Sequence, residues 1–202
     1  MSPYTIKPLT LKDASISAKL HLEGMPKDFL PSFGMKFLKI LHEAIIDSSD
    51  VISHGYFKYN ILVGILFASK NTRNIFLQIL STRLFKLLPF IIIRTLLFPA
   101  TSIKLLQTIA YGLATPRTIP AEILILSVDH KFKRQGIASK LFTKLTQVYT
   151  QKQIKKFLVG TTSGNKEANA FYLKMGGKFI KNLKIYNRIW NMYSFDITKN
   201  QN

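Results

Sequence analysis

The chain has 202 residues, of which 47% are hydrophobic, and 29 Lys and Arg against 10 Asp and Glu give a formal net charge of +19. This length fits one domain over residues 1–202, and the apolar content excludes disorder for lack of buriable surface. Cysteine is absent, which excludes disulfides, thiolate zinc sites and a cysteine nucleophile. The first residues lack the basic segment and apolar run of a secretory signal, so we expect a cytoplasmic protein.

The positive charge favours anionic partners, because it creates a positive field over much of the surface. No zinc-finger spacing and no basic helix with interleaved aromatic residues occurs in the sequence. Nucleic acid is therefore not expected as the main partner, whereas peripheral contact with an anionic membrane stays open.

The first third of the chain has the pattern of a strand, two helices and a hairpin. Residues 4–7 predict a short strand, and Thr10-Leu-Lys-Asp13 is typical of a helix start. A second amphipathic helix is predicted to end near Asp47. Residues 51–59 and 61–69 then predict two antiparallel strands joined by a tight turn.

Residues 72–113 are unusually apolar. The central run, residues 84–98, is interrupted by Lys86, Pro89 and Arg94. A bilayer span needs about 20 mostly apolar residues, so this run is a poor transmembrane helix. We expect one or two helices packed over the sheet. A dimer face, a lid over an acceptor site and a basic amphipathic surface on anionic lipid remain open as alternatives.

The last third alternates strands and helices. Apolar strands at residues 122–129 and 155–162 are joined by a helix at residues 136–152. Two strands joined by a helix lie parallel with a right-handed crossover. A further helix and two strands follow, at residues 165–175, 178–186 and 188–197.

A glycine turn follows the strand at residues 122–129. In Lys133-Arg-Gln-Gly-Ile-Ala138, Gly136 and Ala138 allow close backbone approach, and the two cations suit phosphate. The unpaired N–H groups of the following helix point at the same place. The pattern indicates a pyrophosphate site, although an ordinary turn before a helix would look the same. It matches neither the P-loop nor the three-glycine dinucleotide fingerprint.

Together with the segment Gly164-Asn-Lys-Glu-Ala-Asn-Ala-Phe-Tyr-Leu-Lys-Met-Gly-Gly-Lys-Phe179, this turn resembles the GNAT superfamily of acyl-CoA-dependent N-acyltransferases. The family motif Arg/Gln-x-x-Gly-x-Gly/Ala matches residues 133–138. The motif Asn-x-x-Ala-x-x-aromatic-Tyr-x-x-x-Gly-aromatic matches Asn165, Ala168, Phe171, Tyr172 and Gly176. The family has Arg or Gln where Lys133 stands, and Gly177-Lys178 delays the final aromatic residue.

The resemblance implies an α/β fold with a mixed, mostly antiparallel central sheet, helices on both faces, and a parallel strand pair at the acyl-CoA site. Residues 72–113 would be a helical insertion. Acetyl-CoA would be the cosubstrate, with no metal. Backbone groups at 127–129 would pair with the pantetheine arm, those at 134–139 would hold the pyrophosphate, Asn165 would bind the arm, and Lys174 would reach a nucleotide phosphate. The cofactor-binding residues so implied are Ser127, Val128, Asp129, Lys133, Arg134, Gln135, Gly136, Ile137, Ala138, Ser139, Asn165, Ala168, Phe171 and Lys174.

Tyr172 is the expected general acid, because a thiol leaving group benefits from a proton donor and a phenol stays protonated at neutral pH. Glu122 is the leading candidate for the base that deprotonates the amine, ahead of Asp129 and His130. Purely structural roles also remain open: Tyr172 could be an aromatic packing residue, and Asn165 could be a helix cap. The other three histidines have no metal-binding spacing and are interpreted as structural.

We therefore expect an N-acetyltransferase that moves an acetyl group from acetyl-CoA to a primary amine, on a small molecule or a peptide, by direct attack in a ternary complex. The alternative is a non-catalytic basic module of the same fold that binds an anionic membrane surface or nucleic acid. The acceptor pocket is expected from residues 24–35, 70–113 and the final strands, and a homodimer is left open.

Overall fold

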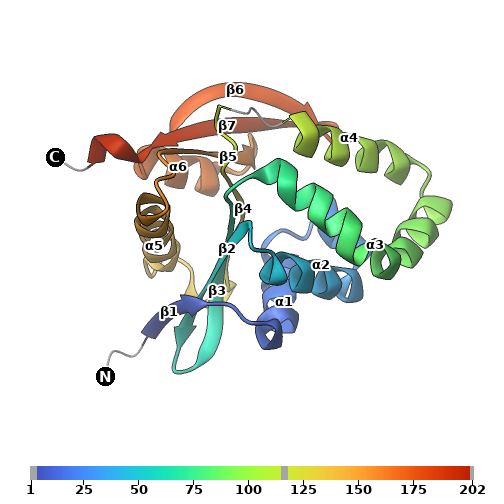
Figure 1. Cartoon of the computed structure of the whole chain (residues 1–202), viewed down its shortest axis with the longest axis horizontal. Helices are drawn as coiled ribbons and strands as arrows, with labels where there is room; N and C mark the ends of the chain where they lie inside the picture. The colour runs from blue at the N-terminus through green and yellow to red at the C-terminus, as the bar shows by residue number, and fades with distance from the viewer. Residues whose placement is uncertain (1–3, 115–117, 201–202) are drawn as a thin grey trace.

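The computed structural model describes residues 4–114 and 118–200, which form one seven-stranded sheet in the order β1-β2-β3-β4-β5-β7-β6 (Figure 1). All neighbouring strands are antiparallel except β4 and β5, which are parallel. The strands are β1 (Tyr4–Pro8), β2 (Val51–Lys58), β3 (Ile61–Ser69), β4 (Glu122–Val128), β5 (Lys156–Thr162), β6 (Lys178–Ile185) and β7 (Arg188–Asp196).

Within these described ranges, six α-helices connect the strands, together with four short 3-10 segments that the sequence pattern did not predict. The α-helices are α1 (Ala14–Gly24), α2 (Met35–Asp47), α3 (Thr72–Leu97), α4 (Ala100–Ala114), α5 (Ile137–Gln151) and α6 (Lys166–Lys174). The 3-10 segments are η1 (Leu11–Asp13), η2 (Leu30–Phe33), η3 (His130–Phe132) and η4 (Ile197–Asn200). The expected fold class is confirmed: a mixed, mostly antiparallel sheet with one parallel pair.

Both tight hairpins turn on the same dipeptide, Tyr-Asn. Tyr59 and Asn60 join β2 to β3 with φ of 49° and 65°, and Tyr186 and Asn187 join β6 to β7 with φ of 56° and 58°. Two consecutive left-handed residues form the turn whose twist matches that of the flanking strands, and Asn tolerates this conformation. The local sequence therefore fixes the register of both hairpins.

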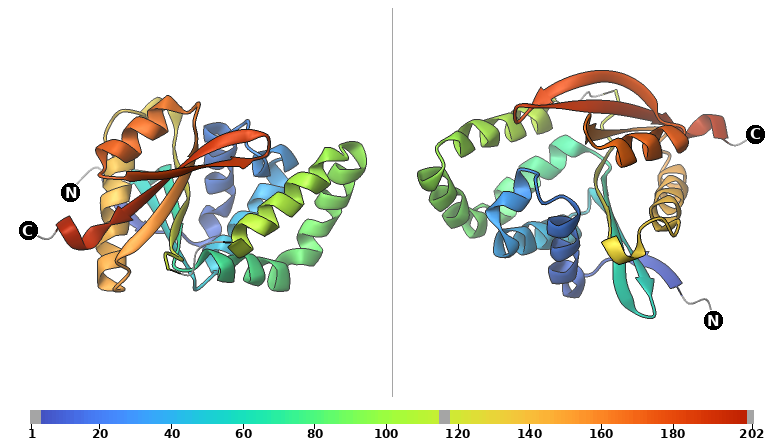
Figure 2. Two further views of the ribbon diagram at one scale, coloured as in Figure 1. Left: turned by 90° about the horizontal axis from the view of Figure 1, so that it is seen from above. Right: turned by 180° about the vertical axis from the view of Figure 1, so that it is seen from behind.

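Helices cover both faces of the sheet (Figures 1 and 2). On one face α5 and α6 enclose a core that includes the fully buried Leu141, Leu145 and Tyr149. On the other face α1 and α2 enclose a second core around Leu38, Ile65 and Phe67. The 3.6-residue spacing of apolar residues on these helices accounts for both cores.

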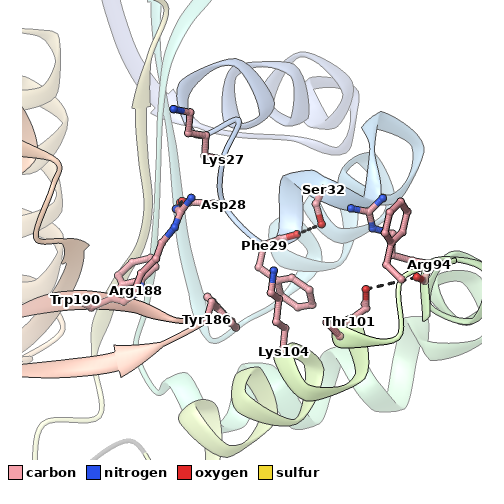
Figure 3. Close-up of a pocket in the computed structure, with 12 residues that line it drawn as sticks. Lys27, Asp28, Phe29, Ser32, Arg94, Thr101, Lys104, Tyr186, Arg188 and Trp190 are labelled. Carbon is pink, nitrogen blue, oxygen red and sulfur yellow. Dashed lines mark hydrogen bonds and ion pairs between the residues drawn. The ribbon is translucent and has the colours of Figure 1, made fainter. Parts of the chain in front are cut away.

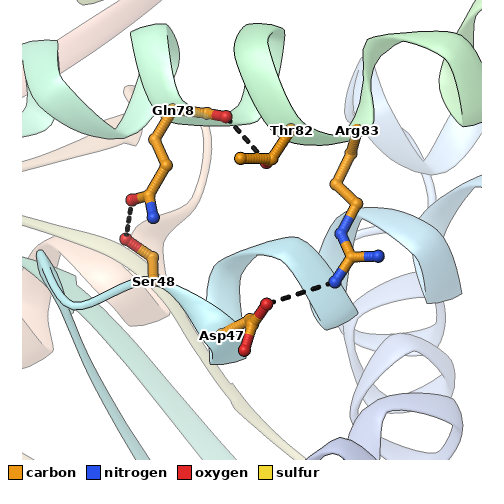
Figure 4. A network of polar contacts seen from close by, with 5 residues as sticks. All are labelled: Asp47, Ser48, Gln78, Thr82 and Arg83. Atoms are coloured by element: carbon orange, nitrogen blue, oxygen red, sulfur yellow. Dashed lines mark hydrogen bonds and ion pairs between the residues drawn. The ribbon is translucent and has the colours of Figure 1, made fainter.

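The insertion between β3 and β4 is a pair of helices, α3 and α4, which extends away from the sheet beyond α2 (Figures 1 and 2). The sequence led us to expect helices packed directly over the sheet. Instead, α3 packs on α2, and Leu87 of α3 is buried in the same core as the α2 side chains. Arg83 of α3 forms an ion pair with Asp47 at 3.2 Å, and the Ser48 hydroxyl donates to Gln78 (Figure 4). These contacts hold α3 to the end of α2.

The end of α4 is held by the β6–β7 turn. The backbone N–H of Tyr186 donates to Gln107 at 3.0 Å, and the Tyr186 hydroxyl is 2.6 Å from the Thr108 hydroxyl. The two inserted helices are thus anchored to opposite sides of the molecule, one to α2 and the other to the last hairpin.

Within the described residues, no single helix is long and apolar enough to cross a membrane. The stretches Thr72–Ile79 and Ser81–Leu97 reach that length and composition only when taken together, and they are bent by 68° relative to each other.

Two buried histidines join α1 to α2. Nδ1 of His21 is 3.0 Å from Nε2 of His42, and Nδ1 of His42 is 2.7 Å from the Ser17 hydroxyl. Burial lowers the pKa of His21 to about 4 and that of His42 to about 3. Both rings are therefore neutral at pH 7 and act as hydrogen-bonding core residues, in line with the structural role inferred from the sequence.

These lowered pKa values predict a loss of stability in mild acid. An unfolded histidine takes up a proton near pH 6.5, whereas the folded rings resist protonation until about pH 4, so the free energy of unfolding falls as the pH drops between these values. Urea unfolding of the native protein and of His42→Gln at pH 7.5 and pH 5 isolates this effect, because other titrating groups cancel in the comparison. We expect the native protein to lose about 2 kcal/mol more than the variant.

The control is Gln151→Ala, because Gln151 is exposed at the end of α5 and carries no ionisable group, so its replacement should leave the native pH dependence unchanged. Equal pH dependence in the native protein and His42→Gln would contradict the proposed neutral histidine pair.

Candidate functional site

The parallel strands β4 and β5 separate soon after they meet. Within the described strands their register pairs Glu122 with Leu158 and Ile123 with Val159, although β4 continues to Val128 and β5 to Thr162. Beyond these pairs the facing edges of the two strands line a cleft of about 1340 Å³. Strand edges without a partner present free N–H and C=O groups, which an extended ligand can satisfy.

A β-bulge in β4 changes the face on which its first residue lies. The register with β3 shifts between Phe67 and Ala68, so Leu124 is an extra residue. Leu124 and Ile125 consequently both pack with the core under α1 and α2, in place of strict alternation. The bulge thereby places Glu122 on the side of the inserted helices, away from α5.

The glycine turn lies at the mouth of the cleft, where it opens α5. Gly136 has φ of 75° and Arg134 has φ of 60°, so the chain passes through two left-handed residues just before the helix. A Cβ atom at Gly136 would have no heavy atom within 4 Å, so the space directly beside the turn is open. The first N–H groups of α5 have no partner within the helix, and together with the helix dipole they form an anion-binding site.

The two cations of this turn are held by one exposed acid. Glu167 at the start of α6 lies 3.1 Å from Arg134 and 3.5 Å from Lys133. The hydrogen bond from Arg134, followed by the charge of Lys133, lowers the pKa of Glu167. An anion bound at the turn would have to compete with this carboxylate for both cations.

Asn165 caps α6, because its side-chain oxygen accepts the N–H of Ala168 at 3.1 Å. The helix-cap role, which the sequence analysis kept as an alternative for Asn165, is thus observed. Asn165 also lines the cleft, opposite the start of α5. In this fold the cap and the expected contact with the pantetheine arm are compatible, because the amide nitrogen of the same side chain remains available as a donor.

The expected cofactor residues come together at this cleft with two differences. Asp129 and Gln135 do not line it: the backbone N–H of Asp129 donates to Val63 at 2.9 Å, and the Gln135 side chain accepts from Lys58 at 3.5 Å. The residues that do line it are Ser127, Val128, Lys133, Arg134, Gly136, Ile137, Ala138, Ser139, Asn165, Ala168, Phe171 and Lys174. Gly24 of α1 also lies at the cleft, and a Cβ there would come within 2.1 Å of the Ser127 hydroxyl.

Tyr172 lies on the wall of the cleft and is 6% exposed. Its ring packs on Phe171, with the ring centres 5.3 Å apart. Tyr172 is therefore both a packing residue and a residue that lines the cleft. Burial raises the pKa of Tyr172 above its ordinary value, which keeps the phenol protonated and able to donate.

Glu122 is buried at the deep end of the cleft. Its carboxylate accepts a hydrogen bond from the Tyr111 hydroxyl and one from the Thr72 hydroxyl, the latter at 3.3 Å. Burial raises the pKa of Glu122 to about 7, although both hydrogen bonds oppose the change. A carboxylate with this pKa is suited to proton transfer near neutral pH.

The partners of Glu122 were missed at the level of sequence. Thr72 begins α3 and Tyr111 lies near the end of α4, so the two ends of the insertion meet over one carboxylate. The sequence holds no motif that joins these positions. The sequence analysis came nearest to these two residues when it expected residues 70–113 to contribute to the acceptor pocket.

A second pocket, of about 250 Å³, adjoins the cleft and shares lining residues with it (Figure 3). It is bordered by the loop after α1, by the α3–α4 turn and by the β6–β7 hairpin, represented by Phe29, Thr101 and Tyr186. These are the three segments expected to build the acceptor pocket. Among the described residues, no cluster of three or more His, Asp or Glu could hold a metal ion.

Residues 107–177 match the family model described as the acetyltransferase (GNAT) family. The match begins in α4 and spans β4, the glycine turn, α5, β5 and α6, which together build the cleft. No curated protein sequence matches this chain.

The structure is similar to many solved structures. N-acetyltransferase from Staphylococcus aureus Mu50 superposes with a TM-score of 0.63 at 13% identity, covering 97% of this chain and 99% of that one. NAA60 of Arabidopsis thaliana in complex with acetyl-CoA gives 0.63 at 12% identity, covering 96% and 99%. Ribosomal-protein-S18-alanine N-acetyltransferase from Escherichia coli gives 0.62 at 10% identity, covering 96% and 94%. At these identities the likeness shows a shared fold.

Acetyl-CoA binding tests the turn at the start of α5. We expect Gly136→Asp to weaken binding at least about tenfold, because it adds a negative charge beside the phosphates. Asp tolerates the left-handed conformation, and a Cβ atom at this position meets no heavy atom within 4 Å. We expect Glu167→Gln to tighten binding about threefold, because it releases Lys133 and Arg134 from an exposed ion pair.

Titration calorimetry at moderate salt measures both effects, with Glu23→Gln as the control because Glu23 forms a comparable exposed ion pair with Lys19 on α1. Unchanged affinity in Gly136→Asp would show that the phosphates bind elsewhere.

Proposed function

We propose that this chain, a member of the GNAT acetyltransferase family by its residues 107–177, transfers an acetyl group from acetyl-CoA to a primary amine by direct attack in a ternary complex. One observation carries the proposal: a single cleft joins the anion site at the start of α5 to the buried Glu122 and Tyr172. The pyrophosphate of acetyl-CoA would bind at the turn, and the amine would enter from the side of the insertion.

The gap between β4 and β5 suits the pantetheine arm. An extended chain with amide groups can pair with free strand edges as an additional strand would. Ser127 and Val128 on β4, and Gly160 to Thr162 on β5, line this part of the cleft. An arm bound there would run from the start of α5 toward Glu122, with its thioester at the point where the two strands meet.

Glu122 takes the role of general base. A primary amine reaches the site as an ammonium ion, which has no lone pair for attack, so the carboxylate accepts a proton from it. The free amine then attacks the thioester carbonyl carbon and forms a tetrahedral intermediate. Tyr111 and Thr72 hold the carboxylate in place through this step.

Tyr172 takes the role of general acid. When the tetrahedral intermediate collapses, the carbon–sulfur bond breaks and the sulfur receives the phenol proton, which yields the amide and the free thiol of CoA. The nitrogen loses two protons in all. Glu122 takes the first and releases it to solvent, and the second, lost from the nitrogen of the intermediate, replaces the proton that Tyr172 gave to the sulfur. Because the thioester is already activated, positioning and proton transfer supply the rate without a covalent enzyme intermediate.

Steady-state kinetics with an amine panel tests these roles. Activity should rise with pH through about 7, because Glu122 acts in its deprotonated form. We expect Glu122→Gln to lower kcat/KM by about 10²-fold or more and to remove this rise, and Tyr172→Phe to lower kcat while acetyl-CoA binding persists. The chain has no cysteine, so a thiol reagent reads released CoA without a background from the protein.

Glu43→Gln is the matched control, because Glu43 lies in an ion pair on α2 away from the cleft. A pH profile that stays flat through pH 7, or a Glu122→Gln variant with native activity, would exclude Glu122 as the base.

A further inference from the structure

The acceptor pocket has an unusual charge. Four cations line it, namely Lys27, Arg94, Lys104 and Arg188 (Figure 3). Among the described residues that line it, Asp28 is the only acid, and it pairs with Arg188 at 3.2 Å. Within the described part of the chain no carboxylate lies within 4.0 Å of the other three cations. The pocket therefore carries a surplus of three positive charges in a concave space, which focuses a positive potential there.

Aromatic rings hold two of these cations in place. The Arg94 guanidinium lies 4.2 Å from the centre of the Phe98 ring, and the Lys104 ammonium lies 6.0 Å from the centre of the Phe29 ring. Such contacts restrict the long side chains before a ligand arrives. The charges are thus partly preorganised, which lowers the entropy cost of binding an anion.

Two buried donors on the pocket wall lack acceptors. Nε of Arg94 and Nε1 of Trp190 are buried, and neither has a hydrogen-bond partner among the described residues. A buried donor without an acceptor costs free energy, and most such groups in folded proteins are satisfied. Both residues line the pocket, so a shift of either side chain toward a carboxylate or phosphate bound there would give its N–H an acceptor.

The pocket is continuous with the reaction cleft. Six residues line both spaces: Lys27, Asp28, Phe29, Tyr186, Arg188 and Trp190. A molecule that occupies the pocket can therefore extend toward Glu122 without leaving the cleft. The pocket lies on the side from which the amine would enter.

We propose that the pocket binds an anionic group, a carboxylate or a phosphate, carried by the acceptor amine. This inference rests on the proposed function and names its substrate class: the anion sits beside Lys104 and Arg94, on the side of the pocket away from Trp190, while the amine reaches toward Glu122 (Figure 3). The guanidinium can bind a planar or tetrahedral oxyanion through two N–H groups, which a lone ammonium cannot do. The overall charge of +19 attracts such an acceptor and repels a polyamine.

Matched amines test this selectivity. Glucosamine 6-phosphate is compared with glucosamine, and the dipeptide Ala-Glu with its neutral analogue Ala-Gln amide, so that the two pairs distinguish phosphate from carboxylate. Trp190 is the only tryptophan in the chain and it lines the pocket, so its fluorescence reports binding without any acetyl transfer. We expect the anionic member of at least one pair to change this fluorescence and to have a kcat/KM about tenfold higher than its neutral partner.

Variants of the two aromatic-held cations sharpen the test. Arg94→Met and Lys104→Met should each lower the ratio of kcat/KM for the anionic amine to kcat/KM for the neutral amine about tenfold. Lys86→Met is the matched control, because Lys86 is an exposed cation on α3 outside the pocket. Acetylation of both members of each pair without preference, or a preference that survives both variants, would overturn the inference and leave the proposed function standing.

Failure of the proposed function gives a different result. If acetyl-CoA does not bind and no amine is acetylated, that function is wrong, and the fluorescence titration still decides whether the pocket takes an anion.

The outer surface of α3 and α4 carries an independent feature. Phe85 is 88% exposed and Leu96 is 76% exposed, and further large apolar side chains are exposed along both helices. They include Leu77, Ile92, Ile93, Leu97, Phe98, Ile103 and Leu106. Singly exposed apolar residues are ordinary, but a cluster of this size on one projecting pair of helices marks an interaction surface.

Charge indicates which partner fits this surface. The sequence from residue 72 to residue 114 contains lysine and arginine but no Asp or Glu. Two of these cations, Arg73 and Lys86, are exposed on α3 together with the exposed apolar side chains. This combination is typical of helices that lie in the headgroup region of an anionic bilayer. We infer that α3 and α4 rest on an anionic membrane surface, with their outer apolar side chains among the lipids.

Vesicle sedimentation tests this contact. We expect the native protein to bind vesicles that contain phosphatidylglycerol and to bind pure phosphatidylcholine vesicles at least about tenfold more weakly. The double variant Phe85→Ser, Leu96→Ser should lose most of this binding, whereas the control Leu11→Ser, Ile16→Ser, which changes exposed residues near the N-terminus, should keep it.

Binding that persists in the Phe85→Ser, Leu96→Ser variant would overturn the membrane assignment. Analytical ultracentrifugation of the same proteins tests the alternative that a second copy of this chain covers the surface. A native dimer that becomes monomeric only in this variant would show that a second copy of the chain covers the surface instead.

Discussion

The separation of β4 from β5 is the constraint on which the rest of the site depends. Parallel strands that stay paired would satisfy each other and leave no room for a ligand. Here they pair only at Glu122 and Ile123 within the described strands and then diverge, so their free edges face a cleft. The start of α5 lies at one end of the same opening and Glu122 at the other, which sets the direction of any ligand bound between them.

The inserted helices α3 and α4 contact the one buried carboxylate of the cleft, that of Glu122, and they also line the adjoining pocket. A buried Glu is costly as an anion, and this cost raises its pKa into the range useful for a base. Tyr111 and Thr72, from the two ends of the insertion, satisfy its oxygens and limit the cost. The same insertion supplies Arg94 and Lys104 to the acceptor pocket, so one addition to the fold would shape both the base and the specificity of the site.

Positive charge lies at both ends of the cleft, and a buried acid lies between them. Lys133 and Arg134 lie at the end beside the start of α5, where we propose that the phosphates bind, and a second group of cations lines the pocket proposed for the acceptor. Between them lies a buried acid whose charge depends on pH near neutrality. Glu167 and Asp28 each hold cations at one end through ion pairs. An anion at either end would exchange places with these carboxylates, which ties ligand binding at both ends to ionic strength.

The sequence by itself determined the features that depend on neighbouring residues. Apolar spacing gave the helices, Tyr59-Asn60 gave the first hairpin, and the glycine turn gave the anion site, because each is encoded within a few positions along the chain. Only the tertiary structure decided which face Glu122 occupies, since that follows from a bulge in β4 set by pairing with β3. It likewise decided that Tyr111 meets Glu122 and that Arg94 and Trp190 share a pocket, because those contacts join segments whose distance in space no local pattern records.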